Sequence, residues 1–152
     1  MSEGWTRMNE DAERERVVEV ARSFIGTRYR PNAKIKGVGV DCGTLLTMAF
    51  AEAGVRAPIV LADYSDQFHM HSVEPRYENE LTKNGARLVE EYRLADIVLY
   101  FQGKQFAHGA IVSQVSPLRI IHAYAPSRCV VEGAESEFGL LVDAQKKFYS
   151  AW

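Results

Sequence analysis

The chain has 152 residues, of which 47% are apolar and 25% charged, and its formal net charge is -2 at pH 7. These values are typical of one globular domain with an ordinary core, and we treat residues 1–152 as a single domain. The charge gives no electrostatic reason to expect nucleic acid or an anionic membrane as a partner. No apolar run approaches the roughly 18 residues of a transmembrane helix.

The N-terminal residues predict a helix rather than a targeting segment. They lack the basic and then apolar order of a secretory signal, so we expect synthesis in the cytoplasm without a signal peptide. Val17, Val20 and Phe24 recur at helical spacing, opposite a face rich in glutamate and arginine. The pattern predicts an amphipathic helix over residues 9–25, ended by Gly26.

A second helix is predicted over residues 42–53, after a polar, glycine-containing loop at residues 27–40. Asp41 stands directly before this helix, where a carboxylate caps the helix or braces the loop. Cys42 is its first residue, so its thiol meets the positive end of the helix dipole. We therefore expect an accessible thiol with a lowered pKa, which favours the nucleophilic thiolate.

Residues 55–75 predict a loop with short helical pieces, and residues 74–84 predict a third helix. His69 and His71 form a His-x-His pair in that loop. Because no second ligand cluster accompanies the pair, the pattern favours a wall of a substrate cleft or an exposed loop over a metal site.

From Leu94 onward the chain changes to short runs of β-branched and aromatic residues that turn residues separate. Strands are predicted over residues 96–101, 108–115, 118–124 and 129–132, joined as an antiparallel meander, and the tail favours a final strand at 147–151. Asp96 is expected to brace the turn into its strand. Helices followed by a meander make an α+β domain, with the helices packed on an antiparallel sheet.

Two cysteines, Cys42 and Cys129, are too few for a disulfide framework or a metal cluster. We predict that both are free and that Cys129 is a small buried apolar residue in its strand. His108 and His122 lie on two of the predicted strands. A helix that carries a thiol and packs on a sheet that carries histidines supplies the groups for nucleophilic acyl transfer.

Five sequence blocks resemble, in order, the NlpC family of cell-wall cysteine endopeptidases, whose fold is a reduced papain-like α+β. The blocks are residues 26–30, 37–42, 94–98, 108–112 and 120–123. The resemblance implies that Cys42 is the nucleophile, His108 the general base and His122 the polar residue that orients His108. It also implies that the Tyr29 hydroxyl lies beside the nucleophile, near an oxyanion site to which the backbone N–H of Cys42 contributes.

Two positions depart from the family pattern. Gly43 and Thr44 follow the cysteine, where the family commonly has Ser-Gly, and Arg28 stands where proline is frequent. The substrate contacts behind the thiol and the loop that presents Tyr29 are therefore the least predictable parts of the site.

The resemblance implies a hydrolase that cuts an amide in the stem peptide of peptidoglycan, of the γ-D-glutamyl–diamino acid type, with no metal or organic cofactor. It is closest to the phage-associated branch, which implies phage tail proteins as partners and a place on the virion or at the cell wall. Two other functions remain open. One is a thiol-dependent acyltransferase or amidase acting on another γ-glutamyl or lipid amide, and the other is a non-catalytic tail-assembly module.

Overall fold

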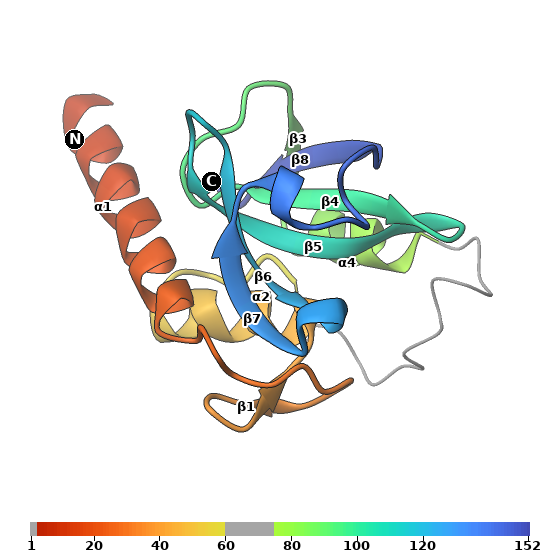
Figure 1. Ribbon diagram of the computed structural model, residues 1–152. Coiled ribbons are helices and arrows are strands. Elements are labelled where there is room, and N and C mark those ends of the chain that lie inside the picture. The colour runs from red at the N-terminus through yellow and green to blue at the C-terminus, as the bar shows by residue number, and fades with distance from the viewer. Residues whose placement is uncertain (1–2, 60–74) are drawn as a thin grey trace.

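The protein is an α+β structure in which helices cover one face of a six-stranded antiparallel sheet (Figure 1). The computed structural model describes residues 3–59 and 75–152. This is the predicted fold class. His69 and His71 lie outside the described residues, so the prediction for that loop stays a prediction. Within the described ranges, no helix has both the length and the hydropathy needed to cross a membrane.

Helix α1 runs over Glu3–Arg22, so both predicted boundaries were wrong. It begins six residues before the predicted start at residue 9, because the two apolar residues among 3–8 are too few to show a helical period. It ends before the predicted residue 25, because the chain tightens there into i to i+3 hydrogen bonds from Phe24 and Ile25. Gly26, with φ +91°, then turns the chain away from the helix.

The segment predicted as loop contains a short hairpin. Strand β1 (Lys34–Ile35) pairs antiparallel with β2 (Gly39–Val40), and Gly37 takes a φ of +79° in the turn between them. The sequence analysis missed this hairpin because a strand of two residues is too short to show alternation of apolar and polar residues. Helix α2 follows over Cys42–Glu52, as predicted.

Helix α4 (Arg76–Lys83) confirms the third predicted helix. Its buried residues are Tyr77 and Leu81, which lie four positions apart and therefore share one face. The next residues form strand β3 (Arg87–Val89), which the sequence analysis missed because three residues carry too little pattern.

The sheet has the order β3-β8-β4-β5-β6-β7, and all its pairs are antiparallel. The strands that the sequence predicted are β4 (Ile97–Gln102), β5 (Gln105–Gln114), β6 (Arg119–Tyr124), β7 (Cys129–Gly133) and β8 (Lys146–Ser150). His108 is the fourth residue of β5 rather than the start of its strand. Strand β8 enters between β3 and β4, so the last strand in the sequence lies inside the sheet.

Alternation along the strands separates two clusters of buried apolar side chains. One face of the sheet, with Ile97, Leu99 and Ile111, packs against α1 and α2 in the main core. The opposite face carries a smaller cluster that includes Val98 and Tyr100. Residues that follow β7 cover this smaller cluster.

A buried ion pair joins the N-terminal helix to the sheet. A guanidinium nitrogen of Arg14 lies 2.7 Å from Asp96 Oδ1, and both side chains are buried. The other carboxylate oxygen of Asp96 accepts the backbone N–H of Arg93 at 2.8 Å. The prediction that Asp96 braces the turn into its strand is therefore confirmed.

Candidate active site

The capping carboxylate of Asp41 fixes the start of α2. Its Oδ1 accepts the N–H groups of Gly43 at 3.0 Å and Thr44 at 2.9 Å, and its Oδ2 accepts that of Asn32 at 2.7 Å. The Thr44 hydroxyl accepts the N–H of Asp41 at 2.8 Å, which completes a capping box. Asp41 thus caps the helix and braces the loop, as predicted. The threonine that departs from the family pattern belongs to the cap.

The Cys42 thiol lies against the backbone of β5. Its Sγ donates to the carbonyl oxygen of Ala107 at 3.7 Å, and the side chain of Cys42 is only 7% exposed. The N–H of Gly109 also reaches the sulfur. The thiol therefore meets the residues on either side of His108, and the expectation that it would be openly accessible was wrong.

Burial, and then the carboxylate of Asp41, raise the pKa of the Cys42 thiol to about 12. The N–H groups of Gly109 and Gly43 act in the opposite direction but more weakly. The predicted lowering of the pKa by the helix dipole was therefore wrong, because desolvation of a thiolate outweighs the dipole at a buried helix start. The resting sulfur is a neutral thiol.

The two histidines meet across neighbouring strands. His108 Nε2 on β5 and His122 Nδ1 on β6 are 2.7 Å apart, and both side chains are buried. Burial, and then the neighbouring His108, lower the pKa of His122 to about 2. His122 is therefore neutral across the physiological range.

Tyr29 lies between the hairpin and the far edge of the sheet. Its N–H donates to the carbonyl of Arg128 at 2.9 Å, and it forms a parallel bridge with Val40, two residues before the thiol. The half-buried ring packs against the main core. This position is compatible with a place beside the nucleophile, and the role of its hydroxyl stays a prediction.

Tyr77 is a site residue that the sequence analysis missed. Its hydroxyl donates to the carbonyl oxygen of Cys42 at 3.3 Å, and its ring closes over β5 at Gly109. A Cβ at Gly109 would lie 2.1 Å from the Tyr77 hydroxyl oxygen, so only glycine fits there. No sequence signal marks Tyr77, because its contact depends on how α4 packs 35 residues away from the thiol.

The environment of Cys129 follows from its position at the edge of the sheet. Cys42 and Cys129 are both free, as predicted, but Cys129 is half-buried rather than buried, because β7 is an edge strand. Within residues 3–59 and 75–152, no group of three or more histidine, cysteine or carboxylate side chains is placed to hold a metal ion.

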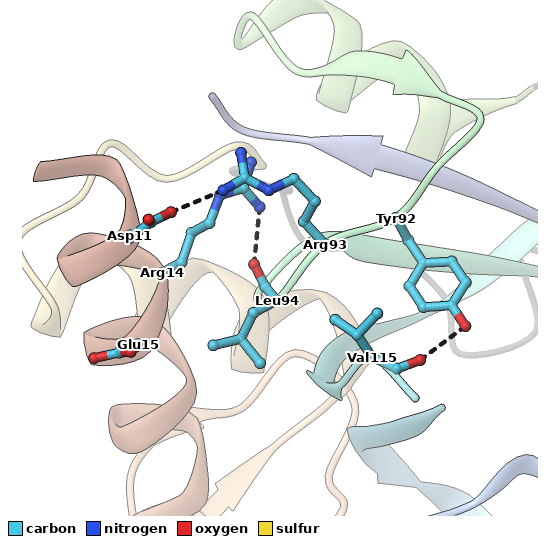
Figure 2. Close-up of a pocket in the computed structure, with 7 residues that line it drawn as sticks. All are labelled: Asp11, Arg14, Glu15, Tyr92, Arg93, Leu94 and Val115. Carbon is cyan, nitrogen blue, oxygen red and sulfur yellow. Dashed lines mark hydrogen bonds and ion pairs between the residues drawn. The ribbon is translucent and has the colours of Figure 1, made fainter. Parts of the chain in front are cut away.

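A hollow of about 260 Å³ lies between α1 and the chain before β4 (Figure 2). In it Arg93 bonds to Asp11 at 2.8 Å and Arg14 to the carbonyl of Leu94 at 2.8 Å. Both guanidinium groups in the hollow are therefore already hydrogen-bonded within the protein, and none of the predicted catalytic residues lines it. Its lining consists of Asp11, Arg14, Glu15, Tyr92, Arg93, Leu94 and Val115.

Comparison with known proteins places the fold. No family model matches the sequence, and neither does the sequence of any curated protein. The structure is similar to the NlpC/p60 domain of the peptidoglycan hydrolase SagA, with a TM-score of 0.56 at 18% identity, over 88% of this chain and 96% of that one. It is also similar to the peptidoglycan hydrolase RipB of Mycobacterium tuberculosis, with a TM-score of 0.62 at 18% identity, over 95% of this chain and 67% of that one.

A eukaryotic protein extends the same comparison. NlpC1 of Trichomonas vaginalis has a TM-score of 0.61 at 14% identity, over 90% of this chain and 43% of that one. At such identities the likeness concerns the fold and not the chemistry. The chain has the papain-like α+β fold of NlpC/p60 domains.

Proposed function

We propose that the protein is a cysteine peptidase that hydrolyses an amide bond in the stem peptide of peptidoglycan. The observation that carries the proposal is the 2.7 Å bond between His108 and His122, together with the packing of the Cys42 thiol against β5, the strand of His108. The fold shared with two peptidoglycan hydrolases supports the substrate class. By the sequence resemblance, the bond is the γ-D-glutamyl–diamino acid amide.

The bond to His122 uses Nε2 of His108, so Nδ1 is the ring nitrogen that takes the thiol proton. Because the resting thiol is neutral, the proton leaves as the sulfur attacks the carbonyl carbon, and no stored thiolate is needed. The product of this step is a tetrahedral oxyanion. His108 becomes an imidazolium whose Nε2–H donates to the neutral His122.

The oxyanion is stabilised at the start of α2. The cap bonds of Asp41 use the N–H groups of Gly43 and Thr44, and we assign the N–H of Cys42 to the oxyanion. Tyr29 is the second donor in this proposal. Collapse breaks the C–N bond, and the proton on His108 goes to the leaving amine.

The thioester is then hydrolysed. Water attacks its carbonyl carbon while His108 takes a proton from the water. Collapse of the second oxyanion breaks the C–S bond, and the proton returns from His108 to the sulfur of Cys42. The products are the free carboxylic acid and the original thiol.

Digestion of purified sacculi tests the proposal. Mass spectrometry of the soluble products should show new muropeptides cut within the stem peptide, and the variant Cys42→Ser should release none. Cys129→Ser is the matched control, since it removes the other free thiol, and it should retain activity. Release by Cys42→Ser equal to that of the wild type, or no release by the wild type, would contradict the proposal.

Incubation of the same proteins with other γ-glutamyl and lipid amides, beside the sacculi, separates the alternatives. An acyltransferase or amidase acting on another γ-glutamyl or lipid amide would cut those amides and leave sacculi intact. A tail-assembly module would cut neither.

The proposal extends to delivery by a phage or prophage tail. Its support is the resemblance of residues 26–29 and 36–42 to the phage-associated branch of the family. An antibody against the chain should detect it in purified virions of the phage that encodes it. Its presence in the lysate alone, with none in the virions, would contradict tail delivery.

A further inference from the structure

Residues 134–145, which we call the strap, connect β7 to β8 and cover the smaller apolar cluster of the sheet. The strap begins with a short 3-10 helix, η2 (Glu135–Glu137). Glu135 accepts hydrogen bonds from the Tyr100 hydroxyl at 2.7 Å and from Lys146 at 2.7 Å. Further along, the N–H of Leu140 donates to the Tyr124 hydroxyl at 3.1 Å. The strap is therefore fastened at both ends of the cluster that it covers.

Two aromatic rings enclose the imidazole of His122. Tyr124, from the same strand, stacks on it with a centroid distance of 4.9 Å and an angle of 26°. Phe138, from the strap, meets it edge to face at 4.3 Å and 73°. The two rings also touch each other at 5.1 Å, and Phe138 is only 5% exposed. His122 itself is fully buried.

The backbone of β7 leaves room for the Phe138 ring. A Cβ at Gly133 would lie 3.0 Å from Phe138 Cζ and 2.5 Å from a carboxylate oxygen of Glu137. Glu137 is itself held by the N–H of Ala134 at 2.7 Å. The ring of Phe138 therefore packs in a space bounded by β7, the strap and His122.

The proposed mechanism requires a particular protonation state of His122. His108 can take the thiol proton on Nδ1 only if its Nε2 carries a hydrogen, which must donate to Nδ1 of His122. His122 must then be neutral, with its own proton on Nε2. That nitrogen is buried and has no hydrogen-bond partner within the described part of the chain. Water at this nitrogen would stabilise the imidazolium, which could no longer accept from His108.

We propose that Phe138 is a positioning residue: its ring excludes water from His122 and so keeps that imidazole neutral and hydrogen-bonded to His108. The inference rests on the proposed function of the site. Among the described residues, the titratable groups that face His122 are His108 from β5 and Tyr124 from β6. The strap contributes Glu135, whose carboxylate accepts from a tyrosine and a lysine, and Glu137, whose carboxylate accepts the N–H of Ala134.

Histidine NMR of the folded protein tests this without any substrate. In the wild type, His122 should show one neutral tautomer with the hydrogen on Nε2 and no titration from about pH 5 to 8. In Phe138→Ala, His122 should begin to titrate in that window. Phe138→Leu keeps an apolar cover and should behave as the wild type. Leu141→Ala, which opens the same cluster but keeps the Phe138 ring, is the matched control and should leave His122 neutral.

Kinetics supply a second readout. In Phe138→Ala, the acid limb of the kcat profile should move to higher pH, with at least a tenfold loss of kcat near pH 6 and little change in KM. If Phe138→Ala does not fold, Phe138→Gln replaces it, because it fills more space while bringing a polar group onto the imidazole. A His122 that stays neutral in these variants overturns the proposal. If the wild type cuts no sacculi, the proposed function fails, and the NMR titration still decides the role of Phe138.

Discussion

The neutral state of His122 should make the protein lose stability in mild acid. The pKa of His122 is lowered from an ordinary value of 6.5 to about 2 in the folded protein. Below pH 6.5 the unfolded chain therefore binds a proton that the folded protein does not. Unfolding is favoured as the pH falls, so the stabilising contribution is complete above about pH 7.5 and is lost progressively below 6.5.

The size of the loss at pH 5 depends only on the pKa of the histidine in the unfolded chain, since the imidazole of the folded protein is still neutral at that pH. A pH 1.5 units below 6.5 corresponds to about 2 kcal/mol in the free energy of unfolding. Carboxylates and the other histidines titrate as well, so the wild type must be compared with a variant. His122→Gln removes this one titration.

Urea denaturation at a series of pH values measures the effect. Between pH 8 and 5 the wild type should lose about 2 kcal/mol more than His122→Gln, whatever their difference in stability at pH 8. Between about pH 7.5 and 8.5 the two curves should run parallel, because the histidine is then neutral in both states. Equal acid losses in the two proteins would mean that His122 is protonated in the folded state, and the reasoning about its burial would fail.

Three further outcomes follow from the site and its supports. The Cys42 thiol should react with iodoacetamide at pH 7 more slowly than a free thiol of pKa about 8.5. Asp41→Asn keeps a capping acceptor but removes a charge, so it should lower the pH at which labelling accelerates. Fast labelling of the resting wild type would contradict the neutral thiol. Gly109→Ala should lower the free energy of unfolding by about 1–3 kcal/mol in urea titrations. Tyr77→Ala should lower it less in the Gly109→Ala background than in the wild type, and equal losses would show that the two positions do not touch. Asp96→Ala removes the nearest carboxylate from the buried Arg14 and should cost about 3–5 kcal/mol by the same titration. A loss below about 1 kcal/mol would show that the pair is not buried in solution.

Local sequence patterns predicted the elements that bear the site. The cap at Asp41 predicted where α2 begins, and the runs of β-branched residues predicted β4 to β7. The alternation of β5 and β6 then allowed His108 and His122 to meet, as expected for neighbouring antiparallel strands. These features depend on neighbours in the sequence, which is why the sequence could reveal them.

The environment of the thiol could not be predicted in the same way. The helix dipole at Cys42 is a local property, but the desolvation that outweighs it comes from β5 and from Tyr77 on α4, which reach the site only through tertiary packing. The hairpin of β1 and β2 and the strand at Arg87–Val89 were missed because their strands are too short to show a period. Phe138 was missed because the strap has no regular pattern.

The position of β8 has a consequence for biosynthesis. Strands β4 to β7 are neighbours in both sequence and space, so this part of the sheet can assemble while the chain is still being made. Among the described residues, strand β3 pairs only with β8, and β4 has an open edge until β8 arrives. The nascent chain therefore exposes the unpaired, apolar edge of β4 until residues 146–150 have left the ribosome and can pair with it.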